Sequence, residues 1–287
     1  TEVSLAGTQE LMRCRDTGVI LATGGIGLVR AAYSSGKPAY GVGPGNVPVY
    51  LDRSADVPRA VRDVVDGKTF DFGTLCSSEQ ALVCDQPVHE QVLQELARNG
   101  AYLLSEAEAA AVAKVVVTAE RLANPAIVGH SAPYIAAQAG LTVPPETRVL
   151  VARLTGVGRE HPLSIEKLSP VLTFYVVDGF KQALERCAEI LRFGGLGHTC
   201  AIHATDKAAI EQYGIAMPAM RIDVNTPSTQ GSIGYTTNLE PSMTLGCGTP
   251  GGNIYSDNIG PRHLINVKRI AYVNEAMAAL TGRPPKA

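Results

Sequence analysis

Apolar residues follow two spacings along the chain, and these spacings alternate. Short apolar or alternating runs predict strands at residues 18–25, 38–51, 80–85, 126–129, 148–153, 171–177, 199–204 and 219–225. Apolar residues three and four apart predict helices at residues 26–36, 54–70, 88–100, 107–122 and 180–195, the second starting with Ser54 as N-cap. Strands separated by helices require parallel crossover connections. The pattern therefore predicts a three-layer α/β/α domain with a parallel-type sheet.

The C-terminal part has a different texture. From Ser228 onward the chain is rich in Gly, Ser, Thr, Asn and Pro, which predicts mostly loop. Residues 262–273 then alternate again and predict a strand. Because no obvious partner strand lies nearby in the sequence, we expect this strand to pair with another subunit.

Composition and charge narrow the function classes. The 287 residues are 45% hydrophobic and carry a formal net charge of −2, without a run of Lys and Arg that would indicate nucleic acid or an anionic membrane as partner. No apolar run approaches the roughly 18 residues needed to cross a bilayer, and the N-terminus lacks the features of a signal peptide. We expect a cytoplasmic protein whose partners are small molecules or copies of itself.

Two of the six cysteines lie eight residues apart in different settings. Cys84 is part of an apolar run that predicts a buried strand, where cysteine acts as a small apolar side chain. Cys76 follows a Gly-Thr-Leu turn and precedes two serines, in a connection that can present a side chain to a cleft. The six cysteines lack the close spacing of a zinc site or a disulfide framework, and the histidines show no metal-ligand spacing, so we expect free thiols and no metal.

Five motifs in order carry a family resemblance. They are ILATGGIGLVRAAYSSGKPAYGVGPGNVP from residue 20, KTFDFGTLCSSEQ from 68, EKLSPVL from 166, GGLGHT from 194 and TLGCG from 244. The sequence resembles CoA-acylating aldehyde dehydrogenases, including the aldehyde dehydrogenase half of bifunctional aldehyde/alcohol dehydrogenases and the propionaldehyde enzymes of bacterial microcompartments. The resemblance covers nearly all residues but not the front of the family's chain. Because the sequence starts at Thr1 inside a helix-then-strand unit, we expect a fragment that is incomplete for activity.

The resemblance implies that Cys76 is the nucleophile. Its thiolate would attack the carbonyl of a short aldehyde, NAD would accept the hydride, and an acyl thioester would remain on Cys76. The backbone N–H of Cys76 is a candidate donor to the oxyanion. Coenzyme A would then take the acyl group. The sequence leaves the aldehyde, and the choice between NAD and NADP, open.

The segment 39–51 distinguishes enzymes that transfer the acyl group to CoA from enzymes that hydrolyse the thioester. Hydrolytic relatives carry a water-activating glutamate at the position that matches Gly41, and this chain has no carboxylate between Ala39 and Leu51. Without a general base, which is typically worth about 10² to 10⁴-fold, attack by water should be slow. The alternative function of a hydrolytic aldehyde dehydrogenase is thereby disfavoured. Gly41 and its neighbours also fit a simple tight turn.

Further site residues follow from the resemblance. Thr23, Gly24 and Gly25 lie where a strand leads into a helix N-terminus, so they are expected to contact the NAD pyrophosphate, although such glycines also form ordinary turns. Glu166 matches the glutamate that holds the nicotinamide ribose; a solvated surface glutamate is the alternative. His198 is a candidate catalytic residue that assists thiol deprotonation or orients CoA, with a structural histidine as the equal alternative.

The resemblance also predicts an organisation. Residues 1–43 would end a Rossmann-like NAD-binding domain, residues 44–245 would form an aldehyde dehydrogenase-like catalytic domain, and residues 246–287 would form a glycine-rich loop and an oligomerisation strand. A homo-oligomer is expected, in the cytoplasm or inside a bacterial microcompartment. A non-catalytic assembly module is the remaining alternative, and the intact Cys76 motif counts against it.

Overall fold

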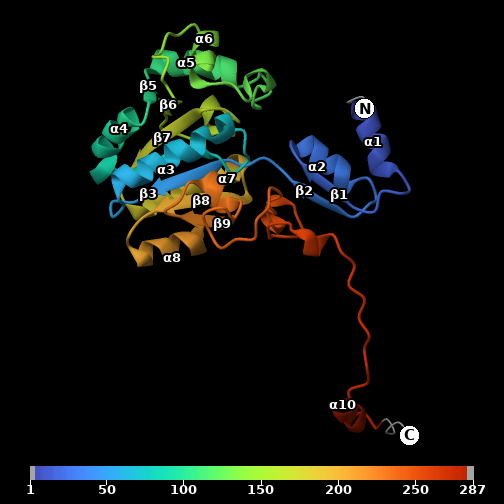
Figure 1. Cartoon of the computed structure of the whole chain (residues 1–287). Coiled ribbons are helices and arrows are strands. Elements are labelled where there is room, and N and C mark those ends of the chain that lie inside the picture. Colours follow the sequence, from blue (N-terminus) through green and yellow to red (C-terminus); the bar gives the residue numbers. More distant parts are fainter. Residues whose placement is uncertain (1–3, 283–287) are drawn as a thin grey trace.

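The chain forms two sheets within residues 4–282, which the computed structural model describes (Figure 1). The smaller sheet has two parallel strands, β1 (Ile20–Thr23) and β2 (Ala39–Val42), which helix α2 (Ile26–Tyr33) connects. Helix α1 (Leu5–Arg13) precedes them. Figure 1 shows this small unit beside the larger body, and the chain runs from β2 directly into the larger sheet.

The larger sheet is parallel throughout, with the strand order β5-β6-β7-β4-β3-β8-β9. Its strands are β3 (Val47–Leu51), β4 (Glu79–Asp85), β5 (Ala101–Leu104), β6 (Val149–Arg153), β7 (Val171–Val177), β8 (Gly197–His203) and β9 (Ala219–Val224). Every residue of β3, β4 and β8 is buried, as expected for central parallel strands covered on both faces. The predicted α/β fold with a parallel sheet is confirmed.

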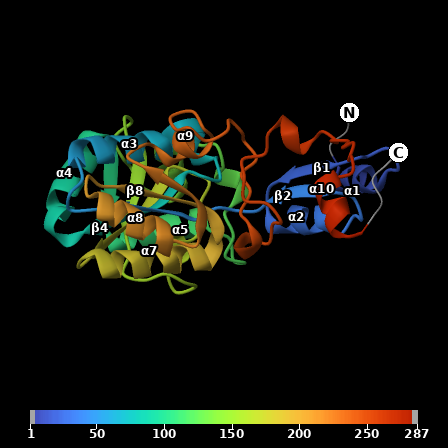
Figure 2. The same ribbon diagram turned by 90° about the horizontal axis from the view of Figure 1, so that it is seen from below.

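Helices cover both faces of this sheet. Helices α3 (Val57–Thr69) and α4 (His89–Arg98) pack on one face, through a core that includes Cys84. The opposite face carries α5 (Glu106–Val116), α6 (Ala132–Gln138), α7 (Phe180–Gly194) and α8 (Lys207–Ala216). Figure 2 shows α3 and α7 on opposite sides of the strands. These are the three layers that the sequence predicts.

The start of α3 differs from the prediction. Its N-cap is Asp56, whose Oδ1 accepts a hydrogen bond from the Arg59 N–H at 3.3 Å. Ser54 was expected there, but its hydroxyl oxygen accepts from the N–H groups of Thr205 and Asp206, at 3.0 and 3.1 Å. Ser54 is therefore used to connect β3 to the turn before α8, and the aspartate two residues later starts the helix.

Other short elements also depart from the prediction. Residues 126–129 form no strand, because Asn124 caps a 3₁₀ turn at Pro125–Ile127. Strand β5 and helices α6 and α8 lie where the apolar spacing predicted no element. Further one-turn 3₁₀ helices occur at Phe70–Gly73, Gln86–Val88, Pro162–Ser164, Thr249–Gly251 and Pro261–His263.

The segment after β9 connects the two sheets. It begins with the short helix α9 (Ser228–Ser232) and continues mostly as loop, as predicted. Residues 245–263, here called the strap, reach the small unit: the Tyr255 hydroxyl donates to the Gly41 carbonyl at 3.0 Å. The Tyr40 hydroxyl donates to the His263 carbonyl at 2.9 Å. The strap and the β2–β3 connection thus hold the small unit at two places.

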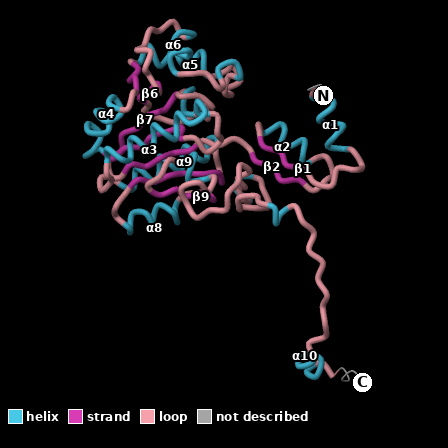
Figure 3. Tube along the Cα trace, in the orientation of Figure 1, coloured by secondary structure: helices cyan, strands magenta, loops and turns pink. Residues whose placement is uncertain are grey.

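The predicted strand at residues 262–273 is not formed. Residues 265–274 have no assigned secondary structure, and Figure 3 shows them as an extended loop that leads away from the body to α10 (Glu275–Leu280). A strand needs a neighbouring strand for its backbone hydrogen bonds, and this segment has none among the described residues. Pairing with another subunit stays a prediction. Within residues 4–282, no helix is long and apolar enough to span a membrane.

Candidate active site

Cys76 lies in a turn with unusual backbone conformation, at the amino end of β4. The turn follows α3 and contains three consecutive residues with positive φ, which are Asp71 at 46°, Phe72 at 53° and Gly73 at 74°. Two of them are not glycine, and such conformations persist only where the surrounding structure enforces them. Cys76 itself is half-buried, so this turn places a thiol just before the amino end of the central strand.

Gly45 is the point at which the predicted site residues meet. A Cβ atom at this position would lie 2.0 Å from the Cys76 carbonyl oxygen and 3.3 Å from Cγ of the His198 ring. The Gly45 N–H donates to Oε1 of Glu166 at 2.9 Å. The structure therefore brings Cys76, Glu166 and His198 together from three distant parts of the sequence, around a residue that has no room for a side chain.

The environment of Cys76 favours the protonated thiol. Burial raises its pKa to about 12, and the negative charge of Glu166 and the thiol of Cys247 contribute in the same direction. The Arg221 guanidinium lowers this pKa. In the free chain the thiol is thus the stable form, and nucleophilic attack requires a neighbouring group or a bound ligand that favours the thiolate.

His198 is not suited to remove that proton. Its side chain is fully buried, and burial followed by the nearby Arg221 charge lowers the pKa of the imidazole to about 3. Nδ1 lies 2.9 Å from the Thr199 hydroxyl oxygen, while Nε2 is buried and has no hydrogen-bond partner among the described residues. The imidazole is therefore neutral near pH 7, which fits a positioning role better than that of a general base.

Glu166 is held in place by a hydrogen bond, and its pKa is raised. Burial raises the pKa of its carboxyl group to about 7, against the opposing effects of the Gly45 N–H and of the Lys68 and Lys167 charges. Only Oε1 accepts a hydrogen bond among the described residues. The other oxygen can accept from a ligand hydroxyl, which fits the predicted contact with a ribose.

A buried ionic cluster behind Cys76 was not predicted. It consists of Lys68, Glu79, Glu166 and Lys167; both lysines are fully buried and Glu79 is 1% exposed. The Lys68 ammonium donates to Gln80 Oε1 at 3.2 Å, and the same oxygen accepts from the Lys167 backbone N–H at 3.1 Å. A sequence signal for Lys68 existed, because it follows Val64 by four residues and so falls on the apolar face of α3.

The predicted phosphate turn lies in the small unit. Thr23 ends β1, and the exposed Gly24 and Gly25 lead into α2. A Cβ atom at Gly25 or Gly27 would meet no atom within 4 Å, and the first N–H groups of a helix have no partner inside it. This open turn fits a pyrophosphate. It is linked to β2 by the Gly24 N–H, which donates to the Val42 carbonyl at 3.1 Å.

Gly41 could not carry the glutamate of hydrolytic enzymes without rearrangement. A Cβ atom there would lie 2.7 Å from Cγ1 of Val29 and 3.1 Å from the Tyr33 ring. Its carbonyl accepts from the hydroxyl groups of Tyr33 and Tyr255, at 3.1 and 3.0 Å. The sequence has no carboxylate at this position, and the packing around Gly41 leaves no space for one.

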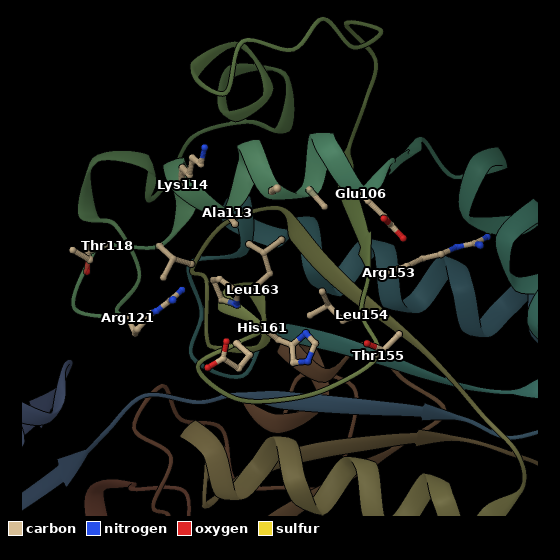
Figure 4. A pocket seen from close by; sticks show the side chains of 16 residues that line it. Glu106, Ala113, Lys114, Thr118, Arg121, Arg153, Leu154, Thr155, His161 and Leu163 are labelled. Carbon is tan, nitrogen blue, oxygen red and sulfur yellow. The ribbon is translucent and has the colours of Figure 1, made fainter.

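A separate cavity lies away from this site. It has a volume of about 680 Å³ between α5 and the loop after β6, with Arg121, Arg153 and His161 among its lining residues (Figure 4). None of the predicted site residues lines it. Among the described residues, no group of three or more His, Cys, Asp and Glu side chains could hold a metal ion.

Comparisons with known proteins bear on the family of the chain. No family model matches the chain. The chain is 44% identical over 281 residues to an aldehyde-alcohol dehydrogenase of Clostridium acetobutylicum, covering 96% of this chain and 32% of the relative. It is 38% identical over 272 residues to an acetylating succinate-semialdehyde dehydrogenase of Clostridium kluyveri, covering 95% and 60%. The chain thus spans about a third of the bifunctional relative and less than two thirds of the other.

Solved structures give the same result. An acetylating aldehyde dehydrogenase from Geobacillus thermoglucosidasius superposes with a TM-score of 0.92 at 52% identity, over 94% of this chain and 60% of that one. A propionaldehyde dehydrogenase from Rhodopseudomonas palustris, solved with bound CoA and an acylated cysteine, superposes with a TM-score of 0.79 at 27% identity, over 88% and 56%.

Proposed function

Because this chain belongs to the acetylating, CoA-dependent aldehyde dehydrogenase family, we propose that it carries the catalytic part of an enzyme that converts a short aldehyde, CoA and NAD to acyl-CoA and NADH. The convergence of Cys76, Glu166 and His198 on Gly45 is the observation that supports this proposal most directly. In the proposal, the nucleophile, the carboxylate for the nicotinamide ribose and a neutral positioning imidazole all lie around this one glycine.

In this proposal the Cys76 thiol first loses its proton to solvent, because His198 is not suited to accept it. The sulfur then forms a bond to the aldehyde carbonyl carbon, and the carbonyl oxygen becomes an oxyanion. The Cys76 backbone N–H is available to donate to that oxygen. NAD, when bound, accepts the hydride that leaves the former aldehyde carbon. The acyl group then remains on Cys76 as a thioester, and the CoA thiol takes it over while Cys76 is released.

The residues for the dinucleotide are the open turn Thr23–Gly25 and the free oxygen of Glu166. We assign residues 1–43 to the end of the NAD-binding domain, residues 44–245 to the catalytic domain, and residues 246–287 to a glycine-rich loop and a C-terminal oligomerisation segment. The separate two-stranded sheet supports the first boundary. One solved relative was crystallised with NADP+, so the preference for NAD is part of the proposal.

Self-association through the C-terminal segment is also part of the proposal. Four large apolar side chains of residues 265–273 are more than half exposed: Ile265, Val267, Ile270 and Tyr272. In an extended strand Ile265 and Val267 would share one face and Ile270 and Tyr272 the other, so both faces of a strand added to another chain's sheet would carry apolar side chains. A location in the cytoplasm or in a bacterial microcompartment stays a prediction; one relative of 28% identity comes from a fucose-utilisation microcompartment.

The test separates acyl transfer from hydrolysis. The full-length protein is mixed with NAD and an aldehyde but without CoA, and NADH is measured per active site. We expect about one equivalent and then a stall at the thioester, because Gly41 supplies no base for water. Among the described residues, Glu166 is the one carboxylate beside the Cys76 thiol that could act as the base in place of the missing glutamate. Sustained turnover to free acid would favour the hydrolytic alternative.

A further inference from the structure

Arg221 is a buried arginine of β9 whose side chain is held by hydrogen bonds on all sides. It is 3% exposed, and its Nε atom donates to the Thr199 hydroxyl oxygen at 3.3 Å. The two terminal nitrogens donate to four further acceptors: the carbonyl oxygens of His198, Gly246 and Ser256, and Oδ1 of Asn258. These five bonds use all five N–H groups of the guanidinium and hold it in one orientation between β8 and the strap.

The Thr199 hydroxyl lies between Arg221 and the imidazole of His198. Thr199 is fully buried, and its Oγ1 lies 2.9 Å from His198 Nδ1. Because a guanidinium can only donate, Oγ1 accepts from Arg221 and its own hydrogen remains to be donated. Among the described residues, Nδ1 is the one acceptor with which Oγ1 makes a hydrogen bond. Thr199 therefore donates to Nδ1, and the hydrogen of the neutral ring lies on Nε2.

The opposite arrangement would leave more buried groups unpaired. If Nδ1 carried the ring hydrogen and donated to Thr199, the Thr199 hydroxyl hydrogen would lack an acceptor and the Nε2 lone pair would lack a donor. In the first arrangement only the Nε2 hydrogen is unpaired among the described residues. Each unpaired buried polar group costs about 1–3 kcal/mol, which favours the first arrangement. Burial and the Arg221 charge lower the pKa of the imidazole to about 3, so the doubly protonated ring is not populated near pH 7.

The geometry points to Thr199, oriented by Arg221, as a positioning residue that fixes His198 as the neutral tautomer with its hydrogen on Nε2, so that His198 serves the reaction as a hydrogen-bond donor. This inference rests on the proposed function for the identity of the acceptor, which is the carbonyl oxygen of the thioester on Cys76. Thr199 touches neither the substrate nor the reacting atoms and acts through His198.

A donor at Nε2 fits the place of the ring and the proposed acyl transfer. A Cβ atom at Gly45 would lie 3.3 Å from Cγ of His198 and 2.0 Å from the Cys76 carbonyl oxygen, so the ring lies beside the residue that carries the thioester. When the CoA sulfur bonds to the thioester carbon, negative charge develops on the carbonyl oxygen, and an N–H group that donates to this oxygen stabilises it. The Nδ1 lone pair is occupied by Thr199, so neither ring nitrogen is available to accept the thiol proton.

The first measurement detects the tautomer itself. The 287-residue chain is labelled with ¹⁵N in its six histidines, and the His198 signals are identified by their absence in His198→Gln. Protonated and unprotonated ring nitrogens differ strongly in ¹⁵N chemical shift. We expect a protonated Nε2 and an unprotonated Nδ1 for His198 at pH 7. A protonated Nδ1, or an average of the two tautomers, would overturn the inference.

Two variants of Thr199 test the positioning role. Thr199→Val removes the hydroxyl group, and Thr199→Ser keeps it. We expect the Nδ1 signal of Thr199→Val to move to the shift of a nitrogen without a hydrogen bond, and that of Thr199→Ser to stay in place. In the full-length protein kcat should fall about tenfold in Thr199→Val and less than about twofold in Thr199→Ser, with an unchanged KM for the aldehyde. Equal results for the two variants would refute the role of the hydroxyl group.

Two variants of His198 in the full-length protein distinguish a donor from a base. Gln carries an amide group at about the distance of Nε2 from the backbone, Asn carries one at about the distance of Nδ1, and neither amide is a base. We expect kcat for acyl transfer to CoA to fall less than about tenfold in His198→Gln and about 100-fold in His198→Asn. An equally large loss in both variants would indicate a base and overturn the donor role.

Folding of each variant is checked by thermal melting. If Thr199→Val does not fold, the ¹⁵N spectrum of the wild-type chain still decides between the two tautomers. Failure of the proposed function is recognised separately, because a Cys76→Ala enzyme would then stay active, whereas the ¹⁵N spectra do not depend on activity.

Discussion

The residues on either side of Ser78 behave as two different kinds of structure. From Glu79 to Asp85 the chain is a regular parallel strand with every residue buried, and Cys84 fills the core between β3 and β7. From Lys68 to Ser78 the chain carries a buried ammonium, left-handed residues and a thiol. The strand is stabilised by regular packing, whereas the turn is held in an unfavourable conformation by its surroundings.

The two thiols differ in their surroundings, and this difference explains why Cys76 can react. Burial raises the pKa of both thiols to about 12, so burial alone does not distinguish them. What distinguishes Cys76 is the set of charged groups around it, namely Glu166 and Arg221, and its partial exposure. Cys84 is fully buried in the apolar core, and its thiol donates one hydrogen bond among the described residues, to the Asp85 carbonyl at 3.4 Å.

The largest effect should come from removing the thiol in the turn. Cys76→Ala in the full-length protein should abolish acyl transfer, because the neighbouring Cys247 thiol is only 3% exposed and is not presented to an aldehyde. The variant should unfold at the wild-type temperature, since a half-buried turn position loses little packing. Activity is measured as acyl-CoA formation, and the unfolding temperature is measured by thermal melting. More than a few per cent of wild-type activity would remove Cys76 from its role.

The regular part of this comparison was accessible from the sequence, and the irregular part was not. The apolar run located β4 and identified Cys84 as a core residue, because a strand that is buried on both faces can be recognised from its own residues alone. The motif around Cys76 indicated the nucleophile, and the resemblance added Glu166 and His198. The pattern did not reveal that Gly45 joins these residues, because their contact depends on the register of three distant segments.

The ionic cluster shows why side-chain class can mislead. A lysine near the end of a helix is normally solvated, and from the sequence Lys68 has no role beyond its place in the predicted helix 54–70. In the structure it is fully buried with Glu79, whose pKa burial raises to about 8. The spacing of Lys68 from Val64 indicates that it lies on the apolar face of α3, but the buried carboxyl group of Glu79 can be identified as a neighbour only from the structure.

The second largest effect should follow from a side chain at Gly45. In Gly45→Ala the new Cβ would lie 2.0 Å from the Cys76 carbonyl oxygen, so the turn must move. We expect a loss of about 1–3 kcal/mol in the free energy of unfolding and of about 100-fold in kcat/KM. Gly43→Ala is the matched control in the same connection, because a Cβ there meets no atom within 4 Å. Equal behaviour of the two variants would contradict the contact.

A smaller effect concerns pH. Because the pKa of Cys76 is raised to about 12, its thiolate fraction is small at neutral pH and grows about tenfold per pH unit. The rate of iodoacetamide labelling of Cys76 in the free chain should therefore rise without a plateau from pH 7 to pH 10. Labelling is measured by mass spectrometry of the Cys76 peptide. A plateau below pH 9 would show that the free chain already stabilises the thiolate.

The smallest effect should come from the strand. Cys84→Ala removes one buried sulfur atom from a site that pairs with Leu51 on one side and Val176 on the other, and the neighbouring strands cannot close the space fully. We expect the free energy of unfolding to fall by about 1–2 kcal/mol, with kcat and KM unchanged, because Cys84 has no charged or polar contact with the site. Urea unfolding and steady-state kinetics are measured on the same preparation. A kinetic defect without loss of stability would mean that the strand, and not the turn before it, carries the chemistry.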